Sequence, residues 1–190
     1  MSKKKISILI SSIILIATII AVCHFENQQI IYEEAKKNEM ENEIELAEQS
    51  IENNTDKEEL QDGILGVLEI KKINMKGLVK EGSDSEVLKN YVGHIENTPK
   101  YDGNICLAAH NRGNLYSYFA KLNQLNIGDE IKYKTIFEEN YFTIDRIEEI
   151  DESDWSMLQD TDEDKITLIT CIKNKKEKRL CVQASKKFDL

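Results

Sequence analysis

The chain opens on an apolar run and then turns polar. Residues 6–23 carry no charge and consist mostly of Ile, Leu, Val and Ala, with Lys3, Lys4 and Lys5 before them and Glu26 after them. As a helix rising about 1.5 Å per residue, this run spans about 27 Å, close to the thickness of a bilayer's hydrocarbon core. The flanking lysines indicate a cytoplasmic N-terminus. We therefore expect a cytoplasmic tail at residues 1–5, a single-pass transmembrane anchor at residues 6–23 and an extracytoplasmic remainder.

A cleaved signal peptide is the alternative to an anchor. The run is longer than the usual apolar region of a signal peptide, and no small-x-small cleavage site follows it, which favours an uncleaved anchor. Cys23 does not match a lipoprotein site, because Val22 stands where such sites have Gly or Ala.

Residues 24–62 are polar and rich in Glu, Asn, Gln and Lys. Their apolar residues recur at loosely helical spacing but form no sustained heptad repeat, which argues against a strong coiled coil. This pattern predicts a partly helical or disordered stalk, with any helix ending at residues 53–56, where two asparagines, a threonine and an aspartate follow one another.

From Gly63 onwards, short apolar runs alternate with turn residues, and residues 63–190 are expected to form one domain. Alternation and turn spacing predict strands at 64–73, 76–80, 104–110, 130–135, 140–150, 165–171 and 179–185. Helices are expected only at 83–91, capped by Ser83 or Asp84, and at 113–125, where an apolar stripe recurs at helical spacing. Such a mainly β domain with few short helices favours a closed antiparallel or mixed β-barrel.

Composition excludes several functions. The 35 acidic and 25 basic residues give a net charge of −10, the opposite of the basic patch that a nucleic-acid-binding protein needs. The four cysteines form no CxxC pair, so zinc-ribbon and thioredoxin interpretations have no support.

Carboxylates cluster between two predicted strands, at Asp151, Glu152, Asp154, Asp160, Asp162, Glu163 and Asp164. A solvated acidic loop is favoured there; calcium binding is the alternative, although the spacing lacks an EF-hand pattern.

Three residues at strand boundaries suggest nucleophilic chemistry. Cys171 ends an apolar strand, where a thiol is both rigidly held and accessible to substrate. A short polar loop after it predicts a hairpin that returns Arg179 beside Cys171, where a guanidinium can favour the thiolate and stabilise an oxyanion. His110 ends another apolar strand and can donate a proton to a leaving amine.

Each of these residues also has an ordinary interpretation. A single Cys in an apolar strand is usually a small core residue, a lone His is more often structural or exposed, and Arg179 lies in a basic loop that solvent can simply hydrate. The three together, each at a strand boundary, are more specific than any one of them.

Four motifs, in order along the chain, resemble those of the sortases. Residues 167–171 (TLITC) resemble the TLxTC signature, and residues 179–184 (RLCVQA) are similar to the RLxVxA strand. Residues 92–99 followed by 108–110 resemble the segment that leads to the catalytic His, and residues 119–129 (FAKLNQLNIGD) look like the FxxLxxLxxGD helix and turn. The resemblance covers residues 63–190.

The resemblance implies an eight-stranded sortase-type β-barrel and a cysteine transpeptidase related to thiol peptidases. It implies that Cys171 forms a thioester with an LPxTG-like C-terminal sorting signal of a surface protein. An amine of a cell-wall precursor such as lipid II, or of a pilin, then resolves the thioester. By motif match, His110 is the acid and base, Arg179 stabilises the oxyanion, and Thr170 and Asn111 contact substrate. No cofactor is implied.

The subclass stays open between class D or E and class B, because Ala109 stands where many members have Gly and Asn111 follows the histidine as in class B-like members. Two other functions also stay open: a non-catalytic membrane-anchored interaction module, and a different cysteine transpeptidase directed at peptidoglycan.

For Cys106 and Cys181 we expect buried free thiols, with a disulfide as the alternative outside the cell. His94 does not match the catalytic position, and we expect a structural role for it.

Overall fold

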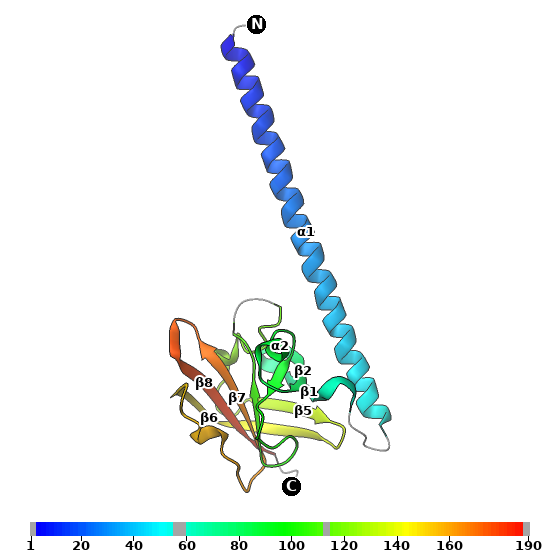
Figure 1. The fold of residues 1–190 in the computed structure, drawn as a ribbon, viewed down its shortest axis with the longest axis vertical. Helices are drawn as coiled ribbons and strands as arrows, with labels where there is room; N and C mark the ends of the chain where they lie inside the picture. The colour runs from blue at the N-terminus through cyan, green and yellow to red at the C-terminus, as the bar shows by residue number, and fades with distance from the viewer. Residues whose placement is uncertain (1–2, 55–59, 112–114, 188–190) are drawn as a thin grey trace. The chain divides into compact units, whose positions relative to one another are not determined.

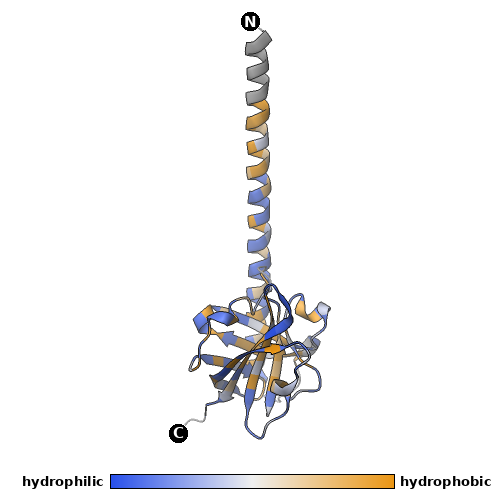
Figure 2. Cartoon of the chain, turned by 90° about the vertical axis from the view of Figure 1, so that its left-hand side faces the viewer, coloured by the Kyte–Doolittle hydropathy of each residue, from blue (hydrophilic) through white to orange (hydrophobic). Residues whose placement is uncertain are grey.

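The computed structural model describes residues 3–54, 60–111 and 115–187, and it divides into two compact units, residues 1–42 and 43–190. One helix, α1 (Lys3–Asn53), forms the first unit and begins the second (Figure 1). It ends at the first of the two asparagines, as predicted, and the expected stalk is helical up to that point. In the coloured part of α1, apolar residues dominate the stretch farther from the barrel end of the helix and polar ones the rest (Figure 2). Within the described residues, α1 is long and apolar enough to cross a membrane by length and composition.

The predicted β-barrel is confirmed. Eight strands close in the order β1-β2-β3-β4-β7-β8-β6-β5. Their bounds are β1 Ile64–Ile70, β2 Met75–Glu81, β3 Val92–His94, β4 Asn104–Ala108, β5 Glu130–Thr135, β6 Glu139–Asp151, β7 Lys165–Ile172 and β8 Lys175–Lys186. Neighbours are antiparallel except for the pairs β2/β3 and β4/β7, which are parallel. The parallel β4/β7 pair sets the ends of these two strands side by side at one rim.

Alternating apolar residues from all parts of the sheet fill the core. Leu68, Ile105, Tyr133, Phe142 and Leu168 are fully buried. The barrel closes between β1 and β5, where Gly66 pairs with Thr135. A Cβ at Gly66 would overlap the carbonyl oxygen of Lys134, so the absent side chain lets the two strands approach closely enough to seal the barrel.

After α1, the helical segments of the barrel unit are short. The helix α2 (Ser85–Leu88) is capped by Asp84, whose side chain accepts hydrogen bonds from the backbone N–H groups of Glu86 and Val87, as predicted. It is shorter than the expected 83–91. The remaining helical turns are of the 3-10 type, η1 Gln61–Gly63, η2 Lys71–Ile73, η3 Leu122–Gln124 and η4 Ser156–Leu158.

One expected helix was wrong, and one strand was missed. The stripe at 113–125 does not form a helix; its first two residues lie outside the described residues, and the rest turns through bonds from residue i to i−3, such as Ala120 to Ser117 and Leu125 to Leu122. Phe119 instead donates its N–H to the carbonyl of His110, so tertiary bonding replaces helical bonding there. The three-residue strand β3 was not predicted, because three residues are too few to show alternation.

Candidate active site

Cys171 lies one residue before the end of β7, and its side chain is exposed. It shares its face of β7 with Thr167 and Ile169, by the two-residue period of a strand. A hollow of about 240 Å³ opens beside it. The lining consists of Asn111, Phe119, Ala120, Asn123, Thr170, Cys171, Ile172, Lys173 and Leu180. Three of the five predicted site residues, Cys171, Thr170 and Asn111, therefore meet at one hollow.

The segment around His110 is fastened to the end of β7 on both sides of the histidine. Thr170 donates its hydroxyl to the carbonyl of Ala109 at 2.7 Å, and Asn111 donates its side-chain amide to the carbonyl of Cys171. The β4/β7 register pairs Ala108 with Ile169, so two further residues bring His110 level with Cys171. Within the described residues the imidazole has no hydrogen-bond partner, and it is half-buried at the rim.

Arg179 arrives where the hairpin prediction placed it. The β7/β8 register pairs it directly with Cys171, and the connection is a tight turn in which Asn174 takes a left-handed conformation with φ of 66°. Its guanidinium points to other partners: Nη2 lies 2.8 Å from a carboxylate oxygen of Glu152, and Nη1 donates to the carbonyls of Lys176 and Lys178. Arg179 and His110 do not line the hollow.

Farther along the same strands from Cys171 and Arg179, a buried polar network fixes the connection between β6 and β7. The Asn104 amide donates to the carbonyls of Met157 and Gln159 at 2.9 and 2.8 Å, and its oxygen accepts from the Thr167 hydroxyl at 2.7 Å. Gln183 donates to the same hydroxyl at 2.9 Å. Three adjacent strands thus hold η4 against the sheet. Sequence reasoning missed this network, since no local pattern links residues so far apart.

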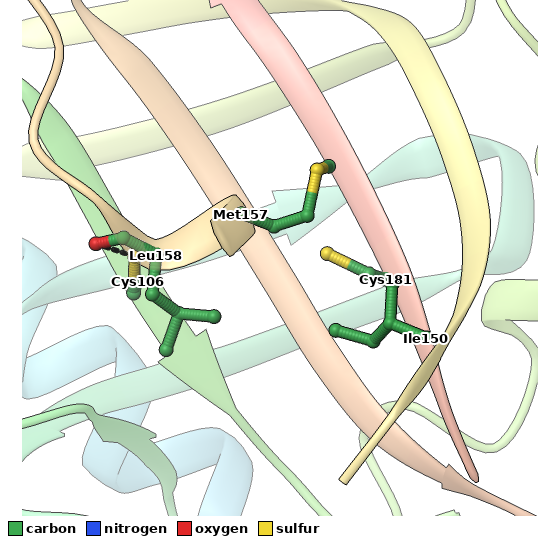
Figure 3. Close-up of a cluster of buried hydrophobic side chains, with 5 residues drawn as sticks. All are labelled: Cys106, Ile150, Met157, Leu158 and Cys181. Carbon is green, nitrogen blue, oxygen red and sulfur yellow. Dashed lines mark hydrogen bonds between the residues drawn. The ribbon is translucent and has the colours of Figure 1, made fainter. Parts of the chain in front are cut away.

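Along β4 and β8, Cys106 and Cys181 lie between that network and the residues level with Cys171. Both are fully buried free thiols, as predicted, in a cluster with Ile150, Met157 and Leu158 (Figure 3). Burial in this apolar cluster raises the pKa of each thiol to about 12. Both therefore stay protonated near neutral pH. Unlike these two thiols, that of Cys171 is exposed.

Several acidic residues from the end of β6 to the start of β7 have separate partners. Asp151 pairs with Lys178 at 2.9 Å, and Asp154 accepts from the backbone of Ser156. Asp164 accepts from Gly103 and pairs with Lys186. Among the described residues, no three His, Cys, Asp or Glu side chains gather as a metal site.

His94 is buried in β3, away from the predicted chemistry. Its Nδ1 lies 3.1 Å from a carboxylate oxygen of Glu81, and its Nε2 lies 3.0 Å from the carbonyl of Pro99 and 3.1 Å from the hydroxyl of Thr98. These contacts tie the β3–β4 connection to β2 and fit the expected structural role.

The structure is a closed β-barrel that carries an exposed thiol near the end of β7. The predicted strand at 104–110 ends at Ala108, so the histidine lies two residues beyond β4, and the arginine lies within β8. The sortase domain model matches residues 68–187, and the chain belongs to the sortase family.

Curated relatives and solved structures agree with that assignment. The chain is 28% identical to sortase D of Bacillus subtilis (strain 168), over 56% of this chain and 53% of that protein. It is 25% identical to sortase A of Bacillus anthracis, over 64% of this chain and 58% of that protein, so it spans somewhat more than half the length of these relatives. The solved sortase D5 transpeptidase of Clostridium perfringens is 30% identical, with a TM-score of 0.62 over 82% of this chain and 98% of that one.

Proposed function

We propose that this chain is a cysteine transpeptidase that joins surface proteins to an amine. The Cys171 thiolate attacks the scissile carbonyl of an LPxTG-like sorting signal, the C–N bond breaks, and His110 protonates the departing amine. An acceptor amine, on a cell-wall precursor such as lipid II or on a pilin lysine, then attacks the thioester. His110 takes up the proton, and the sulfur leaves as thiolate.

The observation that carries this proposal is the exposed thiol of Cys171 at the hollow, with Arg179 of β8 paired opposite it and His110 two residues beyond the end of β4. A nucleophile must be open to substrate on a rigid scaffold, and β7 is hydrogen-bonded on both sides. Arg179, which pairs with Cys171 across the β7/β8 ladder, can stabilise the oxyanion. Thr170 and Asn111 line the hollow, where substrate would contact them.

Family membership supports the choice of substrates, and α1 supports the place of action. We propose that α1 anchors the enzyme in the cell membrane as a single-pass span, with its N-terminus in the cytoplasm and the barrel outside. There it would meet both secreted proteins with a sorting signal and the amine acceptors of the wall.

The test is acylation of the full-length chain, purified in detergent, by a library of peptides that vary each position of an LPxTG-like motif. Intact-mass measurement is expected to detect a thioester with the N-terminal part of the preferred peptide, and peptide mapping is expected to place it on Cys171. Cys171→Ala should abolish the adduct, whereas Cys23→Ser, which removes the other exposed thiol, should retain it.

Absence of any adduct, with correctly folded protein, would favour a non-catalytic interaction module. Acylation by wall peptides and by no sorting peptide would favour the transpeptidase directed at peptidoglycan. Addition of an amine to the acylated enzyme should release a new amide product and return the free thiol, and hydrolysis as the sole outcome would contradict transpeptidation.

A further inference from the structure

The guanidinium of Arg179 has a defined hydrogen-bond arrangement. Of its five N–H donors, two on Nη1 go to the carbonyls of Lys176 and Lys178, at 2.7 and 3.0 Å, and one on Nη2 goes to Glu152 at 2.8 Å. Within the described residues, the Nε–H and the second Nη2–H have no partner. Two donors of a rigid fork are thus left for another molecule.

Glu152 is fixed independently of this ion pair. It follows the last residue of β6, and its backbone N–H donates to the carbonyl of Glu177 in β8 at 2.8 Å. Its carboxylate therefore reaches Arg179 from just beyond the end of β6, the strand that pairs with β8. The side chains of Arg179 and Glu152 are 25% and 51% exposed, so the pair is open to substrate and contributes little to folding stability.

We propose that Glu152 is a positioning residue for Arg179. This inference rests on the proposed function, because it assigns to Glu152 the task of orienting the oxyanion-stabilising group. The carboxylate and the two hairpin carbonyls hold the guanidinium in one rotamer, so that its two remaining donors are already oriented when the tetrahedral intermediate forms. Donors held in advance stabilise a transition state better than mobile ones.

The test compares three variants of the full-length chain in steady-state transpeptidation. Glu152→Ala is expected to lower kcat/KM about five- to tenfold, typical of a coupled neighbour, mainly through kcat, because the oxyanion exists only after attack. Glu152→Gln keeps an acceptor oxygen and should recover most of that loss. Asp151→Asn is the matched control: it removes the adjacent Asp151–Lys178 pair and should change kcat/KM less than twofold.

A double-mutant cycle separates positioning from a general structural effect. In an Arg179→Lys background, which lacks the fork, the loss caused by Glu152→Ala should shrink to less than twofold. An unchanged or increased kcat/KM in Glu152→Ala would overturn the proposal, as would an equal loss in Asp151→Asn or a full loss in the lysine background. Any of these can occur while the wild-type enzyme still forms its thioester, so the proposed function would stand.

Discussion

At the residue scale, the cysteines of the barrel unit differ in environment and so in reactivity. Burial raises the pKa of Cys106 and Cys181 to about 12, and only a thiolate reacts quickly with an alkylating reagent. With the folded-state pKa above its unfolded value, each buried thiol remains protonated at pH 8. We expect iodoacetamide at pH 8 to label Cys171 in the folded protein and to leave Cys106 and Cys181 unlabelled.

Unfolding in denaturant removes the burial that raises the pKa, so all three thiols should then be labelled at comparable rates. Peptide mapping after a timed exposure measures each site separately. Rapid labelling of Cys106 or Cys181 in the folded protein would show that the cluster around η4 opens readily.

At the element scale, the network of Asn104 holds the β6–β7 connection against the sheet. Asn104→Ala removes the donor to two carbonyls, that of the buried Met157 and that of the exposed Gln159. We expect the free energy of unfolding to fall by about 2 kcal/mol, because the buried Thr167 hydroxyl loses its Asn104 acceptor and the Met157 carbonyl keeps only longer hydrogen bonds. Chemical denaturation measures this change, and the exposed Asn123→Ala should stay within about 0.5 kcal/mol of wild type.

Hydrogen exchange locates the effect of the same substitution. Amides of residues 156–159 should exchange faster in Asn104→Ala while those of β7 remain protected, since the connection loosens before the sheet. Equal protection in both proteins would mean that apolar packing alone holds η4 in place.

Elements with strong local signals were predictable from the sequence, and those set by distant contacts were not. Alternating runs identified most strands, and the Asp84 cap marked the start of α2. The segment after His110 was mistaken for a helix because its apolar spacing suits one, whereas in the fold Phe119 bonds back to His110. The hairpin turn predicted the pairing of Arg179 with Cys171, but charge alone gave no sign that Glu152 would engage the guanidinium.

At the scale of the whole molecule, the barrel unit begins inside α1, at Glu43. Ile44 and Ile51 are buried, and Glu48 pairs with Lys76 of β2 at 2.7 Å. The last turns of α1 therefore belong to the packed unit, and they contribute apolar burial that β1 and the strands after it do not supply themselves.

This packing predicts that substitutions on the buried face of α1 lower the stability of the barrel unit more than substitutions on its exposed face. Ile51→Ala should lower the free energy of unfolding of the barrel unit by about 2 to 3 kcal/mol, because it leaves a cavity under the helix. Leu46→Ala, at a position that is 63% exposed, should change it by less than about 0.5 kcal/mol. Urea denaturation of both variants followed by the fluorescence of Trp155 measures the difference, and equal stabilities would contradict the packing of α1 on the barrel.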